Sequence, residues 1–175
     1  MDNTNILPNR DSSMKKKEVK STFYEYTSLS ELSQKQQQLV QEASKAASNA
    51  YAPYSKFHVG AAVLLENGHI ISANNQENSA FPSGLCAERT AVFYANSQYP
   101  NTPILSLVVT AEKDGSPVKF PIPPCGSCLQ VLLESESRHQ TPMEIILYAT
   151  DKIYIADSVE QFLPYGFTSL NLKGS

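Results

Sequence analysis

The sequence has few cysteines, little charge imbalance and no long hydrophobic run, and each of these features excludes a class of protein. Its three cysteines are an odd number that cannot pair completely within one chain, so we do not expect a disulfide-stabilised scaffold. No run of about 18 apolar residues occurs, which predicts no transmembrane helix. The first ten residues lack a basic start followed by an apolar block, so we expect no secretory signal and a cytoplasmic protein.

Composition and charge exclude further classes. Hydrophobic residues make up 41% of the chain and charged residues 18%, which excludes collagen, coiled-coil and wholly disordered proteins. A net charge of −3 is poorly suited to neutralising many phosphates, so we expect neither a nucleic-acid nor a membrane partner. The 175 residues are about one domain's worth. We predict an N-terminal extension of residues 1–28 followed by a single domain of residues 29–175.

Local signals predict the order of the elements. Residues 1–18 are polar and predict a flexible tail, whereas the β-prone residues 19–27 could add an edge strand. The segment Ser28-Leu29-Ser30-Glu31 has capping-box spacing, and the apolar residues behind it predict a helix over about 30–50. Asn67-Gly68 predicts a hairpin turn. The remaining predicted elements are strands at 57–65, 69–73, 104–110, 143–149 and 153–155, and helices at 86–96, 125–137 and 157–163.

This order predicts an α/β domain with three layers, in which helices cover both faces of a mixed sheet of about five strands. The hairpin makes the first two strands antiparallel. Helices separate the later strands, and such connections favour parallel crossovers. We therefore expect a mostly parallel sheet in one undivided domain.

All three cysteines lie in two short segments at predicted helix starts, Cys86-Ala87-Glu88-Arg89 and Pro124-Cys125-Gly126-Ser127-Cys128. The second pair is spaced i, i+3 and shares a helix face, and a helix N-terminus favours thiolates. Taken alone, this pair could be a redox couple, half of a metal site or two buried small hydrophobic residues. A metal site uses all three cysteines, and three thiolates with one open position are typical of catalytic zinc.

Two charged neighbours fit the metal interpretation. The carboxylate of Glu88 beside a metal-bound water is a candidate general acid and base. A cation in the first helical turn, as at Arg89, opposes the helix dipole. Arg89 is either a solvated side chain or a group that donates hydrogen bonds to the thiolates and offsets their charge.

Together these motifs resemble the zinc-dependent cytidine deaminases, in their small homotetrameric subtype with three cysteines. The resemblance covers about residues 30–170. The segments that carry it are Tyr54-Ser55-Lys56-Phe57-His58-Val59-Gly60-Ala61-Ala62, Asn75-Gln76-Glu77-Asn78, Cys86-Ala87-Glu88-Arg89-Thr90-Ala91, Pro124-Cys125-Gly126-Ser127-Cys128-Leu129-Gln130 and Leu163-Pro164-Tyr165-Gly166-Phe167.

The resemblance implies an activity and a cofactor. Cys86, Cys125 and Cys128 would hold Zn²⁺, and Glu88 would shuttle protons. In such enzymes a zinc-bound hydroxide attacks C4 of the base and ammonia leaves. The implied reaction converts cytidine and 2′-deoxycytidine to uridine and 2′-deoxyuridine, a step of pyrimidine salvage.

The resemblance also implies substrate contacts. Backbone groups near Ala87 would meet the edge of the pyrimidine, and Phe57 would pack on it. Asn75 and Glu77 would form hydrogen bonds with the 3′-hydroxyl of the sugar. Phe167 would stack on the base in a neighbouring subunit, so that a homotetramer shares its sites.

Some residues depart from the family pattern. Leu129 replaces a common arginine, and Phe81 replaces a tyrosine found in many relatives, which removes its hydroxyl. His58, His69 and His139 are scattered among strands and a helix end, and we do not expect them to bind the metal.

Three alternative functions are compatible with parts of this pattern. A deaminase of another aminopyrimidine nucleoside, such as a blasticidin-type enzyme, is the nearest, although Asn75 and Glu77 favour ordinary nucleosides. A structural zinc module needs a fourth protein ligand, for which the chain offers no cysteine or well-placed histidine. A nucleic-acid editing domain needs a basic and aromatic groove, which the charge balance does not supply.

The charge of Glu77 also bears on the expected substrate. Its carboxylate would repel a phosphate near the sugar, so a free nucleoside is the expected substrate.

Overall fold

The computed structural model describes residues 14–172, so residues 1–13 of the expected flexible tail lie outside the described part. Its strands are β1 (Tyr24–Tyr26), β2 (Phe57–Leu65), β3 (Ile70–Asn74), β4 (Ile104–Lys113), β5 (Ser116–Pro117), β6 (Glu144–Tyr148) and β7 (Ile153–Ala156). Its α-helices are α1 (Gln34–Ala47), α2 (Ala87–Gln98), α3 (Gly126–His139) and α4 (Ser169–Leu172), and its 3₁₀ helices are η1 (Leu29–Glu31), η2 (Phe81–Ser83) and η3 (Val159–Gln161). No helix among residues 14–172 is both long enough and apolar enough to cross a membrane.

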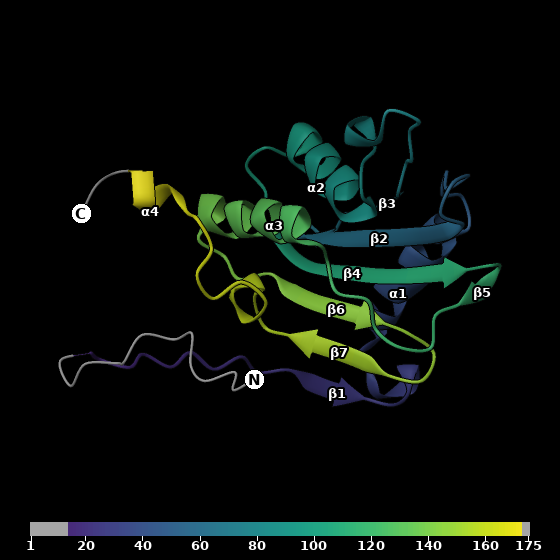
Figure 1. Ribbon diagram of the computed structural model, residues 1–175. Helices are drawn as coiled ribbons and strands as arrows, with labels where there is room; N and C mark the ends of the chain where they lie inside the picture. The colour runs from purple at the N-terminus through teal and green to yellow at the C-terminus, as the bar shows by residue number, and fades with distance from the viewer. Residues whose placement is uncertain (1–13, 173–175) are drawn as a thin grey trace, which may run out of the picture.

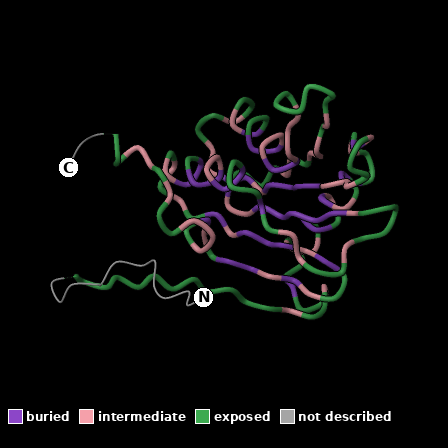
Figure 2. Tube along the Cα trace, viewed as in Figure 1, coloured by how far each residue is buried: buried purple, intermediate pink, exposed green. Residues whose placement is uncertain are grey.

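The expected three-layer α/β architecture and mixed sheet are confirmed (Figure 1). The sheet has seven strands instead of the expected number of about five, in the order β1-β7-β6-β4-β2-β3, with β5 added beside β4. Buried side chains of α1 pack against one face, where they meet alternate residues such as Ala62, Val108 and Ile146. Helices α2 and α3 cover the other face and pack against the intervening residues. The central strands are therefore buried on both sides, whereas the chain before β1 is exposed (Figure 2).

The expectation of a mostly parallel sheet is wrong, because β4 and β6 form its one parallel pair among the described residues. The crossover through α2 does make β4 run in the same direction as β3. However, β2 lies between these two strands and runs opposite to both. A short turn at residues 149–152 joins β6 to β7, which forces an antiparallel pair.

The N-terminal signals form two short helical starts instead of one helix over 30–50. The Ser28–Glu31 capping box closes the 3₁₀ helix η1, and a second box between Ser33 and Gln36 begins α1. The edge strand expected within 19–27 is present as β1. Gly60 allows α1 to approach β2 closely, since an added Cβ there would lie 1.9 Å from the carbonyl oxygen of Ala43.

Candidate active site

The three cysteines converge at the facing N-termini of α2 and α3. Cys86 is the N-cap of α2, Cys125 is the N-cap of α3, and Cys128 lies in the first turn of α3. The Sγ atoms of Cys86 and Cys125 are 4.0 Å apart and those of Cys125 and Cys128 are 3.5 Å apart. Neither N-cap side chain accepts a hydrogen bond from its own helix. The free N–H groups and positive dipole ends of two helices therefore lie beside three sulfur atoms.

This donor set fits a metal ion. All three sulfur atoms lie within 4.8 Å of one another, and tetrahedral zinc with Zn–S bonds of about 2.3 Å needs separations of roughly 3.8 Å. Hydrogen bonds from Cys128, and from Arg89 at 3.6 Å, lower the pKa of the Cys86 thiol to about 5. The contact with Cys86, together with burial, raises the pKa of the Cys128 thiol. The cluster thus holds one negative charge readily, and a divalent cation would allow all three sulfurs to ionise.

Glu88 lies beside this cluster at the start of α2, where its side chain is buried and only 5% of the residue is exposed. Burial raises the pKa of its carboxyl group, and the neighbouring charge of Cys86 acts in the same direction. A buried carboxyl group next to a metal-binding cluster can hold a proton and release it within the site.

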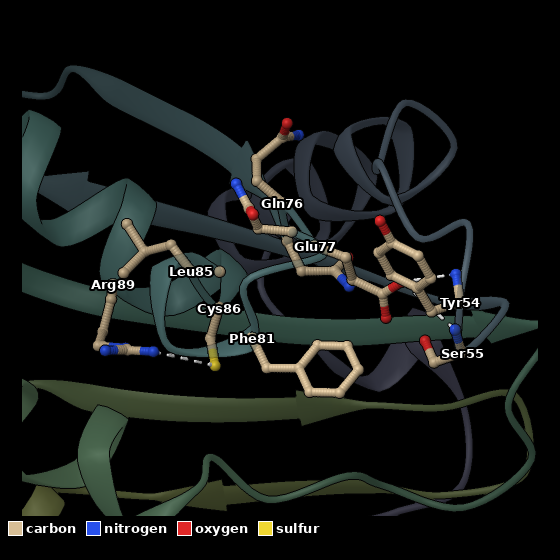
Figure 3. Close-up of a pocket in the computed structure, with 11 residues that line it drawn as sticks. Tyr54, Ser55, Gln76, Glu77, Phe81, Leu85, Cys86 and Arg89 are labelled. Carbon is tan, nitrogen blue, oxygen red and sulfur yellow. Dashed lines mark hydrogen bonds between the residues drawn. The ribbon is translucent and has the colours of Figure 1, made fainter.

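A cavity of about 590 Å³ opens next to Cys86 (Figure 3). Two backbone hydrogen bonds between Gln76 and Leu85 hold the loop after β3 against the residue that precedes Cys86. The loop around Gln76 and the residues around Leu85 therefore lie side by side and line the cavity together. The lining residues are Tyr54, Ser55, Asn75, Gln76, Glu77, Asn78, Phe81, Gly84, Leu85, Cys86 and Arg89.

Glu77 is fixed in the wall of this cavity by the turn that precedes β2. Its carboxylate accepts hydrogen bonds from the backbone N–H groups of Tyr54 at 2.9 Å and Ser55 at 3.3 Å (Figure 3). The hydroxyl of Ser55 and these N–H groups lower the pKa of Glu77, so the side chain is ionised near neutral pH. An ionised carboxylate has acceptor capacity beyond these bonds and can bind a ligand hydroxyl.

Asn75 also lines the cavity, but its amide binds the backbone of β2. The side-chain oxygen accepts from Val59 N at 2.8 Å, and the side-chain nitrogen donates to Phe57 O at 3.0 Å. Asn75 therefore fixes the backbone that carries Phe57, whose half-buried ring is not part of the cavity wall. One N–H and one lone pair of the amide remain available for a ligand.

Two other expected contact residues lie outside the wall. Ala87 is fully buried as the first residue of α2. Phe167 lies beside α3, where its carbonyl oxygen accepts a hydrogen bond from Gln130 at 2.7 Å, and 56% of the residue is exposed. The chain's own fold therefore does not bring Phe167 into this cavity.

Tyr54 and Phe81 also line the cavity, although no sequence motif predicts a ligand-binding role for either residue. Their rings form an edge-to-face pair with centroids 6.1 Å apart. Tyr54 follows the end of α1 closely, and Phe81 belongs to η2, whose place beside the site depends on the loop pairing at Gln76. A signal did exist, since both residues lie inside or next to the segments that resemble the deaminases.

Comparisons with known proteins agree with this geometry. Residues 33–142 match the family model described as "Cytidine and deoxycytidylate deaminase zinc-binding region". A cytidine deaminase of Halalkalibacterium halodurans is 35% identical over 145 residues, which cover 78% of this chain and 97% of that protein. One of Sporosarcina psychrophila is 46% identical over 98 residues, which cover 56% of this chain and 68% of that protein.

Solved structures give the same result. The crystal structure of cytidine deaminase from Burkholderia pseudomallei is similar with a TM-score of 0.63 at 34% identity, covering 74% of this chain and 97% of that one. The enzyme from Mycobacterium tuberculosis gives a TM-score of 0.58 at 33% identity, covering 74% of this chain and 94% of that one. The cysteine cluster, the buried Glu88 and these matches lead to one conclusion: the chain belongs to the zinc-binding cytidine and deoxycytidylate deaminase family.

Proposed function

We propose that this protein catalyses the zinc-dependent hydrolytic deamination of cytidine and 2′-deoxycytidine to uridine and 2′-deoxyuridine. The observation that carries the proposal is the convergence of three cysteine sulfurs, a buried glutamate and a cavity at two helix N-termini. We assign the reaction to pyrimidine salvage in the cytoplasm. The deaminase domain would comprise residues 29–175, preceded by the extension of residues 1–28.

Cys86, Cys125 and Cys128 are the proposed ligands, and His58, His69 and His139 are not. A bound Zn²⁺ would supply a Lewis acid that acidifies the attacking water. Three thiolates would leave the centre with a net charge of −1, which opposes that acidification. Arg89 donates a hydrogen bond to Cys86, so its charge and the two helix N-termini partly offset the thiolates.

Glu88 would move protons between the attacking water, N3 of the base and the departing amine. Its side chain is buried beside the cluster, so the proton stays within the site. The raised pKa of the carboxyl group is consistent with a group that both accepts and gives up a proton in one turnover.

The cavity wall supports a free nucleoside as substrate. Glu77, held by the backbone of Tyr54 and Ser55 in the cavity wall, would accept a hydrogen bond from the 3′-hydroxyl, and Asn75 would add a second bond. Backbone groups near Ala87 would bind the pyrimidine edge, and Phe57 would pack on the ring. Among the described residues that line the cavity, Arg89 is the one lysine or arginine, and it faces Cys86. A phosphate would therefore meet the charge of Glu77 without a free cation to bind it.

A homotetramer would complete the site with Phe167 from a neighbouring subunit. Gly166 presses the backbone against α3, since an added Cβ would lie 2.1 Å from Leu133 Cδ2, and Gln130 fixes the carbonyl oxygen of Phe167. An exposed aromatic ring is thus held on a well-fixed backbone. Phe81 at the cavity is 77% exposed, and burial of such rings by another chain would be favourable.

The direct test is an ultraviolet assay of ammonia loss with cytidine, 2′-deoxycytidine, cytosine and CMP side by side, together with zinc analysis. We expect about one zinc per chain, turnover of both nucleosides and little turnover of the free base or the nucleotide. A zinc-loaded protein that leaves both nucleosides unchanged would exclude the proposed activity. Turnover of blasticidin alone would instead assign the site to another aminopyrimidine nucleoside.

A further inference from the structure

The N-terminal extension packs along the chain segment that leads to Phe167. We define the N-terminal arm as residues 17–26 and the C-terminal segment as residues 157–167. Strand β1 of the arm pairs antiparallel with β7, with Tyr24 opposite Ile155. Lys152 also forms an ion pair with Glu25 at 2.9 Å. The arm therefore runs opposite to the chain that continues from β7 into the C-terminal segment (Figure 1).

Side chains extend this pairing beyond the strand. The rings of Phe23 and Phe162 meet edge to face with centroids 4.9 Å apart. Three further residues of the arm contact the C-terminal segment: Thr22 N donates to Gln161 Oε1 at 2.7 Å, Tyr24 Oη donates to Asp157 Oδ2 at 3.2 Å, and Lys17 Nζ lies 5.4 Å from the ring centroid of Tyr165. The contacts reach within two residues of Phe167.

The opposite side of the C-terminal segment packs against α3. Val159 is fully buried and donates its N–H to Glu136 at 3.0 Å, while Gly166 lies against Leu133. Between β7 and Phe167 the segment contains one short 3₁₀ helix, η3. A segment with so little regular structure depends on its tertiary contacts for a fixed position. Helix α3 and the N-terminal arm supply those contacts from two sides.

We propose that the N-terminal arm positions Phe167 for binding of the pyrimidine in the neighbouring subunit, with Phe23 as the main positioning residue. The inference rests on the proposed function, because it acts through the role assigned to Phe167. Loss of the Phe23–Phe162 contact would let the C-terminal segment sample other positions. The ring of Phe167 would then be ordered only on substrate binding, and this ordering lowers affinity.

The effect should appear in KM and not in turnover. Phe23 contacts none of the proposed zinc ligands, although it lines a cavity of about 460 Å³ together with Pro121 and Pro123, which precede Cys125. Zinc content therefore serves as a check. If the arm acted through the Cys125 loop, its loss would reduce zinc content and kcat.

The test uses the full-length zinc-loaded tetramer with Phe23→Ala, and measures kcat and KM for cytidine, zinc content and subunit association. We expect KM to rise about three- to tenfold with kcat and zinc content unchanged, since an aromatic pair of this kind is lost. Phe23→Tyr, which keeps the ring at a half-exposed position, should restore the original KM. The exposed arm residue Val19 provides the matched control, Val19→Ala, and should leave KM unchanged.

A double mutant separates this inference from the proposed function. If the arm acts through Phe167, Phe23→Ala should add no further rise in KM to the Phe167→Ala protein. A raised KM in Phe167→Ala with an unchanged KM in Phe23→Ala overturns this inference alone. An unchanged KM in Phe167→Ala overturns the role of Phe167, and this inference with it. If Phe23→Ala fails to fold, Lys17→Ala removes only a surface cation–π contact and should raise KM about twofold, and no rise there overturns the inference.

Discussion

At Glu88 a single substitution can remove the proton chemistry of the side chain while keeping its shape. Glutamine has the same shape but cannot accept or release a proton at working pH. We therefore expect Glu88→Gln to keep the fold and about one zinc per chain while kcat for cytidine falls by about 10²–10⁴-fold. Turnover measurements with metal analysis on the same preparation check this. Glu134→Gln makes the same change at an exposed position of α3 and should remain active. Near-normal turnover in Glu88→Gln would remove Glu88 from the mechanism.

The site residues that the sequence identified best are those whose relationship is local. Cys86 and Glu88 lie at the start of one helix, and Cys125 and Cys128 lie at the start of another. The relative positions of the residues in each pair therefore follow from helix geometry alone. Asn75 is different, because its amide binds the backbone of β2, and that contact exists only once β2 and the loop after β3 are in place. Periodicity and spacing carry no information about such a contact.

Strand direction was the main error in the predicted fold, and its cause lies in the connections. A helix between two strands predicts their relative direction but not which strand lies between them, as β2 does between β3 and β4. The predicted strand at 153–155 was correct in place, yet its partner depended on the short turn before it. The two-residue strand β5 and the four-residue helix α4 were missed, because elements so short have no periodic pattern.

Glu136 joins α3 to the strand and 3₁₀ helix that follow it. Its Oε1 atom accepts hydrogen bonds from Met143 N at 2.6 Å and Val159 N at 3.0 Å, and the residue is buried. Burial raises the pKa of its carboxyl group, and the nearby charge of Glu160 acts in the same direction. Because the pKa of Glu136 in the folded protein lies above the ordinary value for a glutamate side chain, ionisation costs stability. This cost grows as pH rises from the ordinary pKa through the folded pKa.

The raised pKa of Glu136 predicts how its substitution changes thermal stability. Glu136→Gln keeps the acceptor without the charge, so we expect equal or greater thermal stability at about pH 8 and a weaker dependence on pH between about 5 and 8. Glu136→Ala leaves two buried N–H groups without an acceptor and should lose about 2–4 kcal/mol. Thermal unfolding of both variants at the two pH values tests this. A loss in Glu136→Gln as large as that in Glu136→Ala would show that the negative charge itself stabilises the fold.

In the proposed homotetramer, each site takes Glu88 from one subunit and Phe167 from another. Glu88→Gln and Phe167→Ala proteins should each be weak enzymes at low cytidine concentration. Tetramers formed by co-expressing the two variants should regain activity, because about one site in four would combine an intact Glu88 with an intact Phe167 under random mixing.

Separately purified variants that are mixed without subunit exchange provide the control, and their activities should only add. Regained activity in the co-expressed tetramers would require that the two residues act across a subunit boundary. If co-expression gives no more than the sum of the separate activities, each subunit uses its own Phe167. That result would conflict with the present geometry, in which Phe167 lies beside α3 and outside the cavity of its own chain.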